Sequence, residues 1–454
     1  MNFIATECND TTAYSLQRLE KVSSLSPQAS NHEKKPHALV ETMKRYAIPL
    51  LFLLLTATAF SQIAEMPAAV DERAAEYFGE GKPVVGGVIG VVNGNTRYAK
   101  GYGRVSLDDD AVPDIDTVYE IASLSKPFTG VLLGEMVARG EVALDDTLDR
   151  FVPEGSRVPR FRRGETVTLR QLATHRSGLP RLPTDFWEVA ATEPDNPYKF
   201  YTDEKIEQFL HAYRLTVAPG TRYEYSNLGA SVLGYVMERK TGLSYEQLVQ
   251  ERICRPLGMT NTAVELTETM QAKLAPPYDA KKQPAKNWDL PGFAAGGGLR
   301  SSMRDLLAFA QAAAGGVDAF PDLAASPDQP RGVDAFPDGV ADQPRGVDAF
   351  PDGVADQLRG VDVFPDGVAP SDHPLVVGMK VASTPHSAEP AVGLGWHING
   401  NGDLTHNGQT GGYHSYIVVS PKSQRAVVLL TNTAVGDPDR LGEALWNAFD
   451  SCFP

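Results

Sequence analysis

Apolar, β-branched runs lie near both ends of the chain, and segments with helical spacing lie between them. The stretch 83–105 predicts a β-hairpin that turns at 93–95. Near the other end, 393–398 and 412–433 are again rich in strand-forming residues, with a turn at 420–424. These patterns predict an α+β fold whose antiparallel sheet is formed by the N- and C-terminal segments.

The middle of the chain predicts a mainly helical region inserted between the two halves of this sheet. Helices are expected over 123–138, 203–213, 227–240, 244–253, 302–314 and, after the last strand, 439–449. Helices would therefore flank the sheet. We expect the functional cleft where the sheet and the helical region meet.

Composition narrows the class of protein. The chain has 454 residues, 42% of them hydrophobic, and a net charge of −15. It is long enough for a large buried core, and its acidity argues against nucleic acid as a partner. Three cysteines are too few for a disulfide scaffold or a Cys-rich zinc module. Whether Cys254 and Cys452 pair stays open, and no obligate protein partner is evident.

The N-terminal part has the pattern of an export signal. Residues 1–42 are polar and aperiodic, and we interpret them as a mis-called or disordered extension. Residues 43–61 combine a basic start, a short apolar run and small residues, as in a secretory signal peptide. This predicts a mature domain over 62–454 that is periplasmic or extracellular. An uncleaved signal would instead leave the protein anchored to the membrane.

A repeated acidic segment interrupts the domain at 316–373. Its register is 14 residues, and it holds 12 Asp against 3 Arg, so it carries −9 of the net −15. Recurring Pro and Asp oppose regular helix or central strand. We interpret it as a flexible surface insertion without a catalytic role.

The first chemical motif is Ser123-Leu-Ser-Lys126, which follows the β-type stretch 118–121 and opens a predicted helix. Residues three apart share a helix face, so the amine of Lys126 can lie beside the Ser123 hydroxyl. A hydroxyl becomes a good nucleophile when a neighbouring base takes its proton. Alone, the motif is equally typical of a helix cap followed by a surface lysine.

Two further motifs supply matching groups. Tyr225-Ser-Asn227 opens another predicted helix, where a phenol beside an ammonium can act as a general base and a carboxamide can orient a lysine and a substrate amide. His406-Asn-Gly408 precedes Gln409. A glycine on an exposed strand edge would let a substrate backbone approach and leave an N–H for an oxyanion.

Together, in this order, these motifs resemble the penicillin-recognising serine hydrolases. The resemblance is greatest to the branch of class C β-lactamases and D-alanyl-D-alanine carboxypeptidases, with related esterases and D-aminopeptidases. It covers about residues 70–450 apart from the acidic repeats, and it implies a β-lactamase/transpeptidase-like fold. Further stretches similar to this family are 172–180, 256–259, 296–301, 305–306 and 393–396.

The resemblance implies a role for each motif residue. Ser123 would be the nucleophile that carries the acyl group, and Lys126 and Tyr225 would share the proton transfers. Asn227 would contact the substrate amide, and the backbone N–H groups of Ser123 and Gln409 would form the oxyanion hole. The substrate would be a small molecule or peptide, such as a peptidoglycan stem peptide, a β-lactam or a small ester. No metal or organic cofactor is implied.

One departure concerns the third motif, where many β-lactamases carry Lys-Thr-Gly. His406 and Gly408 would still help to bind substrate, but a histidine is mostly neutral at pH 7. This difference makes β-lactamase activity less expected than peptidase or esterase activity. A non-catalytic protein that binds a cell-wall partner in the same cleft is the alternative function.

Other histidines and one cysteine are less informative. His175 is expected to order a helix junction, and Cys254 to pack at a helix end. His397, His406 and His414 lack a carboxylate or cysteine at metal-ligand spacing, so a metal site is not expected.

Overall fold

The computed structural model describes residues 66–162, 164–315, 372–434 and 438–453. The extension predicted at 1–42, the signal peptide at 43–61 and nearly all of the insertion at 316–373 lie outside these residues. No helix in the described ranges is both long and apolar enough to cross a membrane.

One large antiparallel sheet joins the two ends of the described chain. Its order is β2-β1-β12-β11-β10-β9-β8-β7, so the N-terminal hairpin pairs with the last strand. The strands are β1 (Gly86–Asn93), β2 (Thr96–Gly103), β7 (Ser387–Ala388), β8 (Ala391–Val392), β9 (His397–Ile398), β10 (Leu404–Gln409), β11 (His414–Ser420) and β12 (Arg425–Thr431). Both predicted hairpins and the shared sheet are confirmed, and the stretch 393–398 forms strand only at its last two residues.

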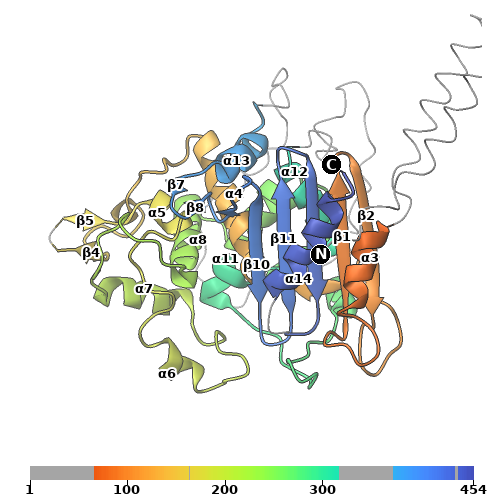
Figure 1. Ribbon diagram of the computed structural model, residues 1–454. Coiled ribbons are helices and arrows are strands. Elements are labelled where there is room, and N and C mark those ends of the chain that lie inside the picture. The colour runs from red at the N-terminus through yellow and green to blue at the C-terminus, as the bar shows by residue number, and fades with distance from the viewer. Residues whose placement is uncertain (1–65, 163, 316–371, 435–437, 454) are drawn as a thin grey trace, which may run out of the picture. The chain divides into compact units, whose positions relative to one another are not determined.

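Helices cover both faces of this sheet because β1 is apolar on both. Val88 and Val92 belong to the main core, which includes residues of α12 (Met303–Ala313). Ile89 and Val91 belong to a second core under α3 (Ala68–Ala75) and α14 (Pro438–Asp450) (Figure 1). A strand buried on both faces loses the usual alternation of apolar and polar residues.

The helical region is inserted between the two hairpins, as expected. Its central helix, α4 (Ser125–Ala138), is buried continuously from Ser125 to Met136, in keeping with its almost uniformly apolar sequence. The other helices are α5 (Leu169–Ala173), α6 (Phe186–Ala190), α7 (Asp203–Ala212), α8 (Asn227–Thr241), α9 (Tyr245–Val249), α10 (Glu268–Lys273), α11 (Ala294–Gly297) and α13 (Pro374–Ser383). Short pairs β3 (Val118–Glu120) with β6 (Arg300–Ser302), and β4 (Arg160–Phe161) with β5 (Glu165–Thr166), complete it.

Details of two helices and the cysteines refine the predictions. The helix expected over 244–253 is α-helical only to Val249 and continues as a π-helix, Gln250–Cys254. The helix expected over 203–213 ends at Ala212. Cys254 is buried at the end of its helix and Cys452 is exposed, and the two do not pair with each other.

The aromatic stack between α4 and α12 predicts a large stability effect. Phe309 lies 3.9 Å, centroid to centroid, from Phe128 and 6.2 Å from Trp396. We expect Phe309→Ala to lower the free energy of unfolding by about 3–5 kcal/mol, because it leaves a buried cavity. Phe200→Ala, at an exposed position, is the control and should cost less than about 1 kcal/mol in the same denaturant titration. Equal losses would contradict this packing.

Candidate active site

Ser123 lies in a tight turn between β3 and α4. A single 3₁₀ turn, η2 (Ala122–Leu124), joins the two elements, and Ala122 has a φ of 49°, which is unusual for a residue with a side chain. Such strain is typical of functional turns. Lys126 follows in the first turn of α4, on the same face as Ser123.

The amine of Lys126 is buried and surrounded by oxygen acceptors. Its Nζ lies 3.0 Å from the Oγ of Ser123, 3.0 Å from the Oδ1 of Asn227 and 2.5 Å from the carbonyl oxygen of Gly296. Burial, helped by the charge of Arg181, lowers the pKa of Lys126 well below its ordinary value. A neutral amine has a lone pair that can accept the Ser123 proton.

Gly296 reaches Lys126 because α11 packs very closely against α8. A Cβ atom at Gly296 would lie 2.7 Å from the Oγ of Ser231 and 3.0 Å from the carbonyl oxygen of Asn227. Only glycine therefore allows this approach without a shift. The glycine-rich stretch at 296–301, noted in the sequence only as family-like, thus provides a direct contact to the lysine.

Tyr225 precedes α8 and brings a phenol to the same place. The Nζ of Lys126 lies 4.9 Å from the centroid of the Tyr225 ring. Burial raises the pKa of Tyr225, and a side-chain hydrogen bond with Ser123 acts in the opposite direction. The Tyr225 phenol therefore lies beside the Lys126 amine and the Ser123 hydroxyl, although Tyr225 is far from both residues in the chain.

Three histidines surround the Tyr225 ring: His175 and His406 are buried, and His397 is half-buried. The ring centroids of His175, His397 and His406 lie 4.4, 6.0 and 6.1 Å from that of Tyr225. Burial lowers the pKa of all three, so they are neutral near pH 7. Among the described residues, no group of three His, Cys, Asp or Glu side chains is arranged to hold a metal ion.

His175 connects the stretch 172–180 to the Tyr225-Ser-Asn227 motif. Its Nδ1 accepts a hydrogen bond of 3.1 Å from the backbone N–H of Ser226, and its φ of 57° places it in a left-handed turn after α5. This contact agrees with the expectation that His175 orders a helix junction. The imidazole of His406 is also buried, and it packs against Tyr225 without lining the pocket.

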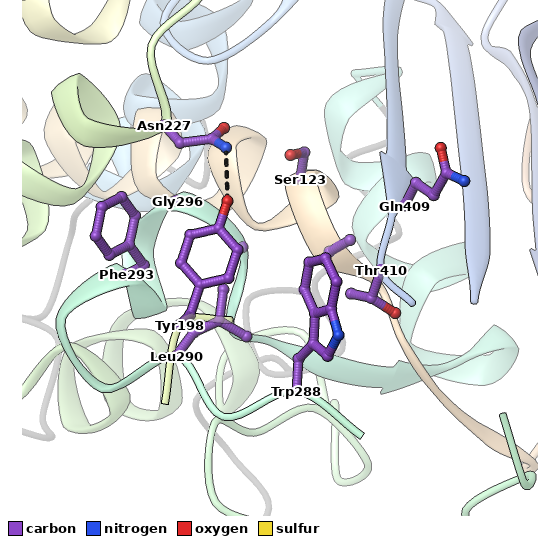
Figure 2. A pocket seen from close by; sticks show the side chains of 11 residues that line it. Ser123, Tyr198, Asn227, Trp288, Leu290, Phe293, Gly296, Gln409 and Thr410 are labelled. Carbon is purple, nitrogen blue, oxygen red and sulfur yellow. Dashed lines mark hydrogen bonds between the residues drawn. The ribbon is translucent and has the colours of Figure 1, made fainter. Parts of the chain in front are cut away.

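A pocket opens in front of Ser123. In Figure 2, Asn227 and Gln409 lie on opposite sides of the serine. Tyr198, Trp288 and other apolar side chains form the wall below, and the Nδ2 of Asn227 donates a 3.2 Å hydrogen bond to the hydroxyl of Tyr198. The sequence gives no signal for these wall residues, because the aromatic side chains lie in loops without a motif.

A buried carboxylate holds Trp288 in that wall. Glu120, three residues before Ser123, accepts hydrogen bonds from the backbone N–H of Trp288 at 2.8 Å and from Asn287 at 3.1 Å. Arg300 lies 3.5 Å away. Burial raises the pKa of Glu120 and the charge of Arg300 lowers it. The strand that leads to the serine therefore also positions the aromatic wall.

Gly408 differs from its expected setting. It is buried in β10, and a Cβ atom there would lie 2.3 Å from the carbonyl oxygen of Ile121 and 3.0 Å from the backbone nitrogen of Ser123. The residue is buried and not exposed, because the protein's own turn occupies the space in the side-chain direction. The glycine instead lets β10 approach the backbone N–H of Ser123 closely, and the next residue, Gln409, is exposed.

Two solved structures share this arrangement of sheet and helices. The β-lactamase/D-alanine carboxypeptidase from Yersinia pestis, solved with citrate, matches with a TM-score of 0.59 and 22% identity, covering 88% of this chain and 99% of that one. The class C β-lactamase from Rhodobacter sphaeroides matches with a TM-score of 0.61 and 21% identity, covering 85% and 99%. The fold is therefore β-lactamase/transpeptidase-like, as predicted.

The chain belongs to the Beta-lactamase family, whose sequence model matches residues 70–359 and 366–449. It is 34% identical over 199 residues to the D-alanyl-D-alanine-carboxypeptidase/endopeptidase AmpH of Escherichia coli K12, covering 44% of this chain and 50% of the relative. It is 30% identical over 211 residues to Protein flp of Staphylococcus aureus N315, covering 45% and 41%. The matched part thus spans half or less of these curated relatives.

The buried histidines predict a loss of stability in acid. Their folded-state pKa values are lowered, so the unfolded chain binds more protons once the pH falls below about 6.5. Stability is therefore present above that pH and is lost below it. Each histidine that stays neutral in the folded state should cost up to about 2 kcal/mol at pH 5.

Urea unfolding at pH 7.5 and pH 5 checks this prediction. We expect His406→Gln to reduce the loss of stability between the two values, and His211→Gln, at an exposed position on α7, to leave it unchanged. The difference between variant and parent cancels the contributions of buried carboxylates such as Glu120. An unchanged pH dependence in His406→Gln would refute the argument.

Proposed function

We propose that this protein is a serine hydrolase that cleaves an amide or ester through an acyl-enzyme formed on Ser123. The observation that carries the proposal is the convergence of three groups: the Lys126 amine lies 3.0 Å from the Ser123 hydroxyl and 4.9 Å from the centroid of the Tyr225 ring. Relatives in the Beta-lactamase family are serine hydrolases, which agrees with this chemistry.

In the proposed acylation step, the Ser123 oxygen attacks the substrate carbonyl carbon and its proton passes to the neutral amine of Lys126. The developing oxyanion is stabilised by the backbone N–H groups of Ser123 and Gln409. The close approach of Gly408 to the Ser123 nitrogen supports this pairing. The bond to the leaving group then breaks, and the leaving group takes the proton that the Lys126–Tyr225 pair holds.

Deacylation returns the serine. A water molecule attacks the acyl carbonyl and gives a proton to the Lys126–Tyr225 pair, and the acyl–oxygen bond breaks to release the acid and restore the Ser123 hydroxyl. Asn227 is held by Lys126 and Tyr198, so its carboxamide is oriented toward the pocket, where it would contact a substrate amide.

The substrate class follows from the site and the relatives' names. We propose a D-alanyl-D-alanine-type peptide, a β-lactam or a small ester, and an exported location. The neutral, buried His406 supplies no fixed charge where many β-lactamases carry a lysine. This favours peptidase or esterase activity over β-lactam hydrolysis.

Replacing the nucleophile tests the reaction. We expect Ser123→Ala to abolish covalent labelling by a fluorescent penicillin and to reduce hydrolysis of a 4-nitrophenyl ester by at least about 10³-fold, because no acyl-enzyme can form. Ser106→Ala, at a half-buried position that does not line the pocket, is the control. Labelling without turnover would favour the peptidase activity, and ester turnover alone would favour the esterase. Labelling that persists in Ser123→Ala would remove the serine from this role.

Replacing the buried amine tests proton transfer separately from folding. Lys126→Gln should slow acylation by about 10²–10⁴-fold, because it removes the amine that lies 3.0 Å from the Ser123 hydroxyl and would accept its proton. Lys199→Gln, a surface lysine paired with Glu193, should be neutral. Stopped-flow acylation and an unfolding curve of each variant provide the measurement. A folded Lys126→Gln protein with normal acylation would contradict the mechanism.

A further inference from the structure

A single arginine adds positive charge beside this largely neutral pocket. The guanidinium carbon of Arg181 lies 5.1 Å from the centroid of the Tyr225 ring. Its side chain is exposed, and it forms no ion pair with a carboxylate in the described part of the chain. An arginine that rests on an aromatic ring keeps its N–H groups available for an anion.

The backbone holds Arg181 rigidly on the Asn227 side of the pocket. Its carbonyl oxygen accepts hydrogen bonds of 3.1 Å from the backbone N–H groups of both Asn227 and Leu228, the first residues of α8. The neighbouring Pro180 carbonyl accepts a 2.7 Å hydrogen bond from the hydroxyl of Ser226. These hydrogen bonds join the loop to the start of α8. They fix the backbone from which the Arg181 side chain extends, next to Asn227.

The remaining groups at the site supply little permanent charge. The side chains that line the pocket are neutral: Ser123, Tyr198, Asn227, Trp288, Gln409 and Thr410, with Leu290 and Phe293. Burial keeps His406 neutral and favours the neutral form of Lys126. Arginine, by contrast, stays protonated in proteins.

We propose that Arg181 is a specificity-determining residue that binds a carboxylate on the acyl part of the substrate. This rests on the proposed function, since it assumes that the acyl group is transferred to Ser123. The Arg181 carbonyl is hydrogen-bonded to the backbone of Asn227, whose carboxamide is proposed to contact an amide of the acyl group, and this assigns the anion to the acyl side and not to the leaving group. The preferred substrates are therefore acyl donors with a free carboxylate.

The reach of the side chain sets the position of that carboxylate. The guanidinium carbon lies 5.1 Å from the centroid of the Tyr225 ring, that centroid lies 4.9 Å from the Nζ of Lys126, and the Nζ lies 3.0 Å from the Ser123 hydroxyl. The arginine is therefore at most about 13 Å from the nucleophile, a span of about four extended residues. A carboxylate one or two residues from the cleaved bond fits this span.

A matched pair of esters tests the proposal on the full chain. The charged ester is 4-nitrophenyl hydrogen glutarate and the neutral one is 4-nitrophenyl methyl glutarate; both have the same leaving group. With spontaneous hydrolysis subtracted, Arg181→Gln should lower kcat/KM at least about tenfold for the charged ester and less than about twofold for the neutral one. Arg181→Lys should recover part of the loss. High salt should weaken the wild-type preference for the charged ester.

Arg222→Gln is the matched control. Arg222 is also exposed and lies three residues from Tyr225, but it pairs with Glu224. The control removes the same charge and should leave the ratio of the two esters unchanged. Equal losses for both esters in Arg181→Gln would show that the arginine acts only on Tyr225 or on folding, and this would overturn the proposal. An unchanged ratio would also overturn it.

A binding measurement separates this proposal from the proposed function. If the wild type hydrolyses neither ester and takes no label, the hydrolase assignment fails. Calorimetry with glutarate, against glutaramide, at low salt then decides on the anion site by itself. Weaker glutarate binding in Arg181→Gln than in Arg222→Gln would support the site, and equal binding would overturn it.

Discussion

The site depends on burying one amine among oxygen atoms from three separate segments. Lys126 contacts Ser123 within its own turn, Asn227 at the start of α8 and the carbonyl of Gly296 in α11. Burying an ammonium is costly unless hydrogen bonds compensate for the lost water, and the cost falls if the group gives up its proton. The burial that disfavours the charged form of Lys126 in the folded protein therefore also lowers its pKa, so that the amine can accept a proton.

Glycines provide the close backbone approaches that this burial requires. Gly395 has a φ of 71°, and a Cβ atom there would lie 2.1 Å from the carbonyl oxygen of Lys126. Gly408 lets β10 reach the turn that carries Ser123. Beside Gly395, the fully buried Trp396 stacks on Phe309 of α12. The short glycine-containing stretches near the C-terminus thus support the turn that holds Ser123 and the helix that holds Lys126. Gly395 and Gly408 do so without lining the pocket.

Most of the architecture was predictable from local patterns. Both hairpins, the helices at 123–138 and 227–240 and the joining of the two ends in one sheet followed from periodicity and turn residues. The sequence also pointed to Ser123, Lys126, Tyr225 and Asn227, because their motifs resemble those of a known family, and the structure brings these residues together. Tyr198, Trp288 and Arg181 were not identifiable, since loop residues have no periodicity and reach the site only through long-range packing.

By itself, the sequence determined which reactive groups exist, which of them share a helix face and which segments form strands, because these properties depend on neighbours a few residues apart. Only the tertiary structure decided that the phenol, the amine and the hydroxyl meet. It also decided that His406 is buried and neutral, and that Arg181, which forms no ion pair among the described residues, lies over the Tyr225 ring. The physical reason is that burial, and with it the charge of each group, is set by contacts between residues that are distant in the chain.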